Sequence, residues 1–215
     1  MDTPIHFGIA VDGDAKRFCD EGLGGVYIAN EIARLADPLA AVAIFDAGIW
    51  NAEAAHVTRP PNPLVPKVGG TMHQASSLEG VAALAGLPAE ALRGTVEDYN
   101  RAVDAQAFSS LEPSRTPAVY RPRPIRTAPF YAAPLCAGIT YTMGGIFIDG
   151  QCRVVRRAGG VFEGLYAAGS CTGGHEGGPV AGYTGGLGKA MTFGWHAGNC
   201  IGERARVLRP GALAA

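Results

Sequence analysis

Apolar positions form short runs and one-sided stripes along the chain, which predicts a mixed α and β protein. Apolar runs at 5–11 and 41–45 predict strands, and the first ends in the turn-forming sequence VDGDA. Between them, apolar residues at Ile28, Ile32 and Leu35 predict a helix.

Two helices are predicted in the middle of the chain. Ser76 with Glu79 three residues later is a capping-box signature for a helix over 78–84. The stronger helix begins near Pro88, where four apolar residues recur at i, i+4, i+7 and i+11 and form one stripe: Leu92, Val96, Tyr99 and Val103.

Prolines divide the rest of the chain. The segments 57–70 and 109–129 carry four and five prolines, which predicts irregular connections because proline donates no ladder hydrogen bond. We interpret 109–129 as a hinge and its arginines, Arg115 included, as a solvated face, with contact to an anionic group as the alternative. Beyond it, GGIFID at 144–149 and CRVV predict a hairpin, GLYAAG at 164–169 predicts a buried strand, and 188–203 has a helical pattern.

Composition excludes several functions. With 18 basic and 19 acidic residues and a net charge of −1, nothing favours nucleic acid or an anionic membrane surface. No apolar stretch approaches the roughly 20 residues that span a bilayer, and no signal peptide is recognisable. The five cysteines are widely spaced without a Cys-x-x-Cys pair, so we expect a cytoplasmic protein without disulfides, and no metal site.

The chain has 31 glycines, and 19 of them lie between Gly138 and Gly202. One glycine-rich turn follows the predicted strand at Ala168-Gly169, and a second, 183–188, leads directly into the last helix. The first N–H groups of a helix have no internal partner, and the helix dipole places partial positive charge there. Such a terminus suits an anionic or electron-rich ring edge. The alternative is that these glycines only make tight turns.

Three segments then carry a family resemblance. TMGGIFID, GLYAAG and GLGKAMTFGWHAG resemble, in order and spacing, the C-terminal FAD-binding segment of the fumarate reductase/succinate dehydrogenase flavoprotein family. IAVDGDAKRFCDE is similar to the family's entry into its substrate-capping domain, SLEGVAALAGLPAEALRGTVEDYN to that domain's helices, and APFYAAPLCAGITYTMGG to the return into the FAD domain.

The resemblance implies an α+β capping domain joined to the C-terminal part of a Rossmann-like α/β FAD-binding domain. It places the capping domain at 1–128 with its entry strand at 5–11, the FAD-binding segment at 129–205 and a tail at 206–215. It also implies the residues that contact FAD: Gly144, Gly145, Ala168, Gly169, Ser170, Gly173, Gly174, Gly186, Leu187, Gly188 and Lys189.

The chain departs from the family in two respects. The front βαβ unit, which begins with Gly-x-Gly-x-x-Gly and holds the FAD pyrophosphate, has no counterpart, since Gly22-Leu23-Gly24-Gly25 follows the polar sequence AKRFCDE and is interpreted as a loop. We therefore expect a partner chain that carries this half. Ser170 also stands where the family usually has Glu, and His175 and Glu176 are weaker candidates for a contact with substrate or cofactor.

The residues that make a fumarate reductase are also absent. Gly25 stands at the position of the proton-donating Arg, and no arginine occupies the final turn, so a dicarboxylate lacks its charge-assisted partners. Tyr141 and Tyr183 remain, which is similar to 3-ketosteroid dehydrogenases, where tyrosines polarise a ketone and assist proton removal. Both could instead be packing residues.

Two functions follow. The first is a component of an FAD-dependent dehydrogenase or reductase acting on a CH–CH bond beside the carbonyl of a small-molecule substrate, a ketosteroid or similar enone, with Tyr183 and Tyr141 as catalytic residues. The alternative is a non-catalytic truncated remnant or a binding module that keeps the capping fold. The complete glycine pattern of GLGKAMTFGWHAG favours the first.

Overall fold

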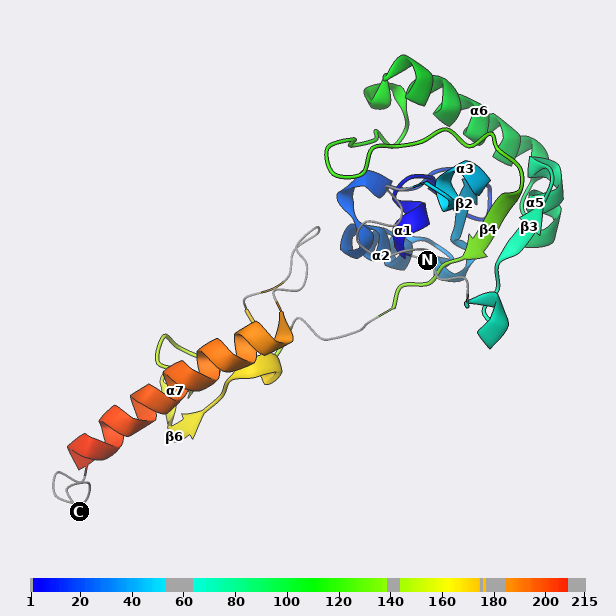
Figure 1. The fold of residues 1–215 in the computed structure, drawn as a ribbon. Helices are drawn as coiled ribbons and strands as arrows, with labels where there is room; N and C mark the ends of the chain where they lie inside the picture. Colours follow the sequence, from blue (N-terminus) through cyan, green and yellow to red (C-terminus); the bar gives the residue numbers. More distant parts are fainter. Residues whose placement is uncertain (1, 53–63, 139–143, 175, 177–184, 209–215) are drawn as a thin grey trace. The chain divides into compact units, whose positions relative to one another are not determined.

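The computed structural model describes residues 2–52, 64–138, 144–174, 176 and 185–208. It divides the chain into two compact units, Met1–Gly138 and Ile139–Ala215, which are considered separately (Figure 1).

The first unit is built on a four-stranded antiparallel sheet in the order β1-β2-β4-β3. Its strands are β1 (Ile9–Val11), β2 (Val42–Asp46), β3 (His73–Ala75) and β4 (Phe130–Pro134). Its α-helices are α1 (Asp2–Ile5), α2 (Gly25–Arg34), α3 (Ala47–Trp50), α5 (Leu78–Ala85) and α6 (Ala89–Ala105). The central strand β2 is buried along its whole length, so the predicted strand at 41–45 is confirmed within one residue.

The helix ends follow local chemistry. Pro88 precedes α6, whose residues Leu92, Val96 and Tyr99 are buried in the core as their spacing predicts. The cap of α5 was wrongly assigned by one residue, because Ser77 rather than Ser76 accepts the hydrogen bond from the Gly80 amide, at 3.0 Å. Ser77 adopts the extended backbone that an N-cap requires.

The predicted first strand, 5–11, is only partly correct. Its first residue ends helix α1, and the Pro4 carbonyl accepts hydrogen bonds from the amides of Phe7 and Gly8. Strand pairing starts at Ile9, opposite Ile44. Gly8 lies so close to β2 that a β-carbon on it would be 2.4 Å from the Ile44 carbonyl oxygen, so a side chain is excluded there.

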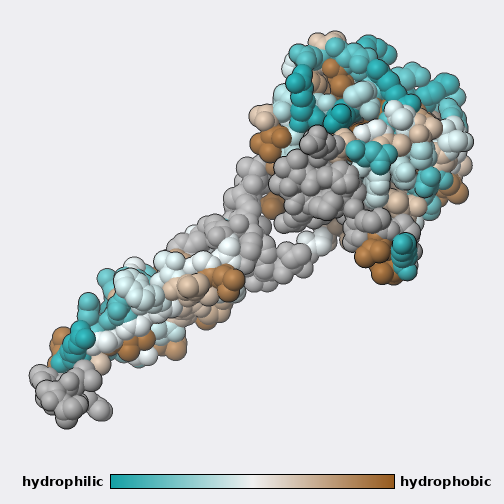
Figure 2. All heavy atoms as spheres, viewed as in Figure 1, coloured by the Kyte–Doolittle hydropathy of each residue, from teal (hydrophilic) through white to brown (hydrophobic). Residues whose placement is uncertain are grey.

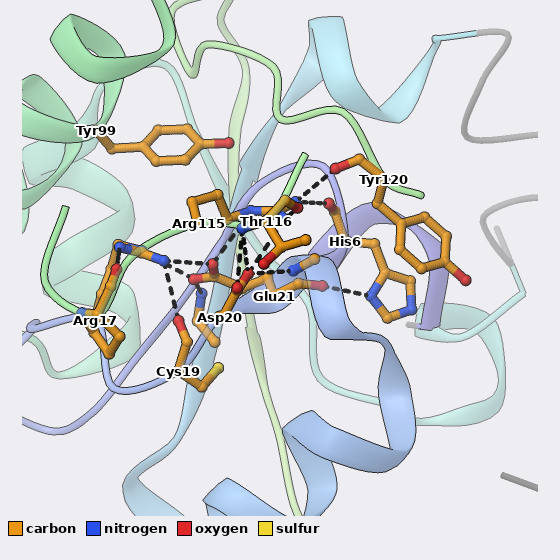
Figure 3. A network of polar contacts seen from close by, with 12 residues as sticks. His6, Arg17, Cys19, Asp20, Glu21, Tyr99, Arg115, Thr116 and Tyr120 are labelled. Carbon is orange, nitrogen blue, oxygen red and sulfur yellow. Dashed lines mark hydrogen bonds and ion pairs between the residues drawn. The ribbon is translucent and has the colours of Figure 1, made fainter. Parts of the chain in front are cut away.

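The segment 109–129 is not a hinge, because buried polar contacts fix it to the first unit (Figure 3). Arg115 is 2% exposed, which contradicts its placement on a solvated face. Its guanidinium lies 3.5 Å from Asp20 and from Glu21 and donates to the carbonyl oxygens of His6 and Tyr120. The compact unit ends at Gly138 instead.

Glu21 is the acidic centre of this network. Its fully buried carboxylate pairs with Arg17 at 2.7 Å and accepts from the Ala10 amide at 2.9 Å. The neighbouring Gly22 leaves no room for a side chain, since a β-carbon would lie 1.8 Å from the Arg115 guanidinium. Packing against Arg115 therefore explains why residue 22 is a glycine. The residues Glu21–Leu23 form a short 3-10 turn.

The second unit contains a two-stranded antiparallel hairpin of β5 (Arg153–Val155) and β6 (Val161–Tyr166), and the long helix α7 (Gly186–Leu208). The Cys152 thiol lies 3.8 Å from the Phe193 carbonyl oxygen, and Arg204 pairs with Glu163, so α7 runs beside the hairpin (Figure 1). The predicted helix 188–203 is confirmed and extended at both ends.

One expectation for this unit is wrong. GLYAAG was predicted as a buried strand, but β6 occupies Val161–Tyr166 and four of its six residues are exposed. The apolar sequence therefore lacks cover among the described residues. The division into a capping domain at 1–128 and an FAD-binding segment at 129–205 stays a prediction, with β4 belonging to the first unit's sheet.

The described residues contain neither a membrane-spanning helix nor a cluster of metal ligands. None of their helices has both the length and the apolar composition to cross a membrane. They also contain no group of three or more His, Cys, Asp or Glu side chains arranged to hold a metal ion.

Candidate functional site

The two glycine-rich segments predicted to face a cofactor meet at the start of α7. Residues Gly169–Cys171 form a 3-10 turn, η5, that packs on this helix. Gly169 has φ +76°, a conformation that L side chains rarely adopt, and a β-carbon on it would lie 3.3 Å from that of Ala190. The absence of a side chain at Gly169 therefore lets η5 pack directly against α7.

A second close approach fixes the other side of this turn. The Ile146 amide donates to the Cys171 carbonyl at 2.7 Å, and the Gly173 amide donates to the Ile146 carbonyl at 3.2 Å. A β-carbon on Gly145 would lie 2.6 Å from the Cys171 carbonyl oxygen, and one on Gly173 would lie 2.6 Å from the Gly145 amide nitrogen. Contacts within the protein therefore account for Gly145, Gly169 and Gly173.

The remaining glycines are different. A β-carbon on Gly144, Gly174, Gly185 or Gly188 would meet no described atom within 4 Å. Gly174 and Gly185 also have positive φ, at +93° and +104°. Beside them Leu187 is 82% exposed. Positive φ accounts for glycine at Gly174 and Gly185, whereas neither backbone conformation nor contacts among the described residues account for Gly144 and Gly188.

The start of α7 has the electrostatics expected for an electron-rich ligand. Its first turn contains no acidic residue, so nothing within the helix offsets the positive end of its dipole. The Lys189 amide already donates to the Gly185 carbonyl at 3.0 Å, which closes the first helical turn. Amides before Lys189 belong to the group that lacks intrahelical acceptors.

Lys189 itself points into the protein. Its ammonium donates to the Thr172 carbonyl at 3.1 Å and pairs with Glu176 at 2.8 Å. The two side chains are 5% and 1% exposed. This pair was not predicted from the sequence, although a lysine in the first turn of a helix is a usable signal, because it opposes the helix dipole and calls for an acidic partner.

The structure describes most, but not all, of the predicted site residues. Ser170 is exposed on η5 and Ala168 is half-buried just before it. Gly144, Gly145, Gly169, Gly173, Gly174, Gly186, Leu187, Gly188 and Lys189 lie around η5 and the first turn of α7. Tyr141, Tyr183 and His175 lie outside the described residues.

Apolar side chains are exposed on this unit (Figure 2). On α7, Leu187, Met191 and Trp195 follow one another at intervals of four residues and are 82%, 72% and 73% exposed. On and before the hairpin, Ile146, Phe147, Phe162 and Leu165 are also exposed. Exposed apolar residues that gather on one surface are typical of an interaction surface or a ligand-binding groove.

Comparison with known proteins places this site in a family. The model of the family described as "FAD binding domain" matches residues 8–186. The chain is 39% identical over 114 residues to an NADH:acrylate oxidoreductase from Vibrio harveyi, an alignment that covers 53% of this chain and 11% of the relative. It is 34% identical over 157 residues to a 3-oxosteroid 1-dehydrogenase from Mycobacterium tuberculosis, covering 63% of this chain and 26% of the relative.

A solved structure gives the same result at the level of fold. The 3-ketosteroid delta1-dehydrogenase from Sterolibacterium denitrificans, in complex with 1,4-androstadiene-3,17-dione, matches with a TM-score of 0.70 at 24% identity. The match covers 95% of this chain and 40% of that one. This chain thus spans well under two thirds of the length of the relatives it matches.

The family match defines the class of protein to which the chain belongs. The chain belongs to the FAD binding domain family, which confirms the resemblance found in its motifs. The mixed α and β content agrees with the family's solved structures. FAD, the cofactor of this family, also fits the residues present, since open glycine backbone beside an unneutralised helix terminus can receive a planar, electron-rich ring.

Proposed function

We propose that this chain is a component of an FAD-dependent dehydrogenase or reductase acting on a CH–CH bond next to a carbonyl. The observation that carries the proposal is the start of α7, where a β-carbon on Gly174, Gly185 or Gly188 would meet no described atom within 4 Å beside a helix terminus. FAD supplies a two-electron acceptor or donor when it is bound. The chain's own residues orient the ring and handle the proton.

Each group of site residues has a separate task in this proposal. Gly144, Gly174 and Gly188 leave room for the ring, while Gly145, Gly169 and Gly173 hold the backbone in the required shape. Ser170 and Leu187, both exposed, and Ala168 and Gly186 beside them complete the contact surface. The exposed N-terminal amides of α7 stabilise negative charge on the pyrimidine side of the ring.

The FAD pyrophosphate is bound, in this proposal, by a separate polypeptide that carries a Gly-x-Gly-x-x-Gly unit. One observation supports an additional part of this kind, since the apolar side chains of β6 and α7 are exposed among the described residues. A heteromer would cover that apolar surface.

Tyr183 and Tyr141 are the proposed catalytic residues. A tyrosine hydroxyl can donate to a ketone oxygen, stabilise the enolate that develops there, or transfer the proton beside it. The names of two relatives, an oxosteroid dehydrogenase and a ketosteroid dehydrogenase, refer to substrates with such a carbonyl. We therefore propose a ketosteroid or a similar enone as the substrate class.

The location proposed for the protein is the cytoplasm. All five cysteines are free thiols, and Cys136 and Cys171 are exposed. Exposed thiols without a disulfide partner are typical of a reducing compartment.

Co-expression with a Gly-x-Gly-x-x-Gly protein tests the proposal. A yellow complex with flavin absorbance is expected, and reduction of the flavin by a 3-oxosteroid would identify the substrate class. Tyr183→Phe in that complex should slow turnover by roughly a hundredfold while flavin stays bound. If the two chains fold correctly but their complex is colourless, the chain is better explained as a non-catalytic binding module. If Tyr183→Phe leaves the turnover rate unchanged, Tyr183 is a packing residue.

A further inference from the structure

Lys189 occupies a position that is unfavourable for a cation in two ways. It lies in the first turn of α7, where the helix dipole is positive, and its side chain is only 5% exposed. Both the dipole and the loss of hydration disfavour an ammonium at such a place. Apolar residues of similar volume often replace a buried ion pair without loss of stability, so a structural role alone does not require this charge.

Glu176 compensates for that position. Its carboxylate, 1% exposed, lies 2.8 Å from the Lys189 ammonium, and the Thr172 carbonyl oxygen accepts a second hydrogen bond at 3.1 Å. The pair links residues thirteen apart in sequence, so it ties the turn that follows η5 to the first turn of α7. Buried pairs of this kind seldom stabilise a fold more than apolar packing does.

The pair stands next to the groups assigned above to the flavin. Lys189 follows Gly188 directly, and Thr172 precedes Gly173 and Gly174. A buried charge is screened far less than a surface charge, so either member of the pair acts on a ring at the helix terminus. The two charges oppose one another, and the balance between them sets the local potential.

We propose that Lys189 and Glu176 set the reduction potential of the flavin, an inference that rests on the proposed function. The ammonium reinforces the positive end of α7 and favours the reduced ring, which carries more negative charge. The Glu176 carboxylate partly cancels this stabilisation of the reduced ring and fixes the position of the Lys189 ammonium. The two residues are therefore positioning and potential-setting residues, and neither needs to touch the substrate.

Opposite charge changes should move the potential in opposite directions. Glu176→Gln leaves the ammonium unneutralised and should shift the flavin midpoint potential to more positive values, favouring the reduced form by about tenfold. Lys189→Met leaves the carboxylate unneutralised and should shift the potential to more negative values. The double variant should lie close to the wild type. A purely structural pair would instead give shifts of one sign, or none.

The measurement is a reductive titration against a reference dye, monitored by flavin absorbance, in the complex of this chain with its Gly-x-Gly-x-x-Gly partner. Glu163→Gln is the matched control, because Glu163 pairs with Arg204 at 2.5 Å in the same unit but is 64% exposed. This control should leave the potential unchanged. Lys189→Arg, which keeps the charge, should restore a potential close to that of the wild type.

The outcomes separate this inference from the function on which it rests. Shifts of opposite sign for Glu176→Gln and Lys189→Met support it. Bound flavin with unshifted potentials in the folded single variants overturns it and leaves the proposed function intact. A wild-type complex that binds no flavin overturns both. If Lys189→Met fails to fold, Glu176→Gln decides alone, and an unchanged or more negative potential refutes the inference.

Discussion

Gly145 and Gly173 lie against each other so closely that a β-carbon on Gly173 would be 2.6 Å from the Gly145 amide nitrogen. Their contact joins the segment before β5 to the turn after η5, next to the parallel bridge between Ile146 and Thr172. The second unit therefore contains glycines of two kinds. Some are needed for the protein to pack on itself, and others leave space free.

Neighbouring glycines should respond differently to the same added methyl group. Gly145→Ala places its β-carbon against backbone and should lower the free energy of unfolding by about 1–3 kcal/mol. Gly144→Ala meets no described atom within 4 Å and should leave that free energy nearly unchanged. Urea denaturation of the full chain measures both. Equal destabilisation by the two variants would contradict the packing assignment.

Arg115 should be essential to the first unit. Arg115→Met leaves the carboxylates of Asp20 and Glu21 buried with less compensation and should cost about 3–5 kcal/mol of stability. Arg121→Met is the matched control, since Arg121 lies in the same proline-rich segment but is exposed, and it should change stability little. A small effect of Arg115→Met would show that the network is not needed to fix 109–129.

The stability of the first unit should fall at alkaline pH. Burial raises the pKa of the Tyr99 phenol, which donates to the Phe7 carbonyl at 2.9 Å, and burial also raises the pKa of the Cys19 thiol. In the unfolded chain these groups ionise near about 10 and 8.5. Below those values their contribution to stability is complete, and it is lost progressively as pH rises above them toward the raised pKa values of the folded protein.

Chemical denaturation from pH 7.5 to 10.5 measures this dependence. Each group should contribute a slope of up to about 1.4 kcal/mol per pH unit once its unfolded form ionises. Tyr99→Phe should remove the part of the slope that develops near pH 10. Stability that stays constant to pH 10.5 would contradict the burial of both groups.

Thiol labelling should report on the cofactor surface. Cys136 and Cys171 are exposed, whereas Cys19 is fully buried. Because Cys171 belongs to η5, bound flavin should slow its alkylation, and Cys136 provides an internal control that should react at an unchanged rate. Mass spectrometry after brief alkylation, with and without flavin, distinguishes the two. Equal rates for Cys171 in both samples would place the ring elsewhere.

Much of the fold could be predicted from local patterns. The stripe of Leu92, Val96 and Tyr99 identifies α6 because every member points into one core. The expected burial of GLYAAG failed for a different reason. An apolar run indicates that a strand needs cover, but the sequence does not reveal where that cover comes from, and β6 is largely exposed in the described part of the chain.

The polar network could not be predicted in the same way. Arg115 and Glu21 are 94 residues apart, and neither has a sequence neighbour that reveals the other. Pro-rich composition therefore suggested a hinge where the structure has an anchored segment. For the site, the glycine pattern located the segments correctly, but only the structure separates Gly145, which packing explains, from Gly188, which it does not.

Flavin binding by Gly188→Ala, in the complex with the Gly-x-Gly-x-x-Gly partner, tests most directly whether the ring lies at the start of α7. Gly188 lies in α7 with no described atom near its β-carbon position, so alanine should preserve or slightly raise stability, by about 1 kcal/mol. Gly94→Ala, at an equally open position in α6, is the matched control. Gly188→Ala should weaken flavin binding by about tenfold or more, while Gly94→Ala should not. Equal flavin affinity in the wild type and both variants would contradict the placement of the ring at the start of α7.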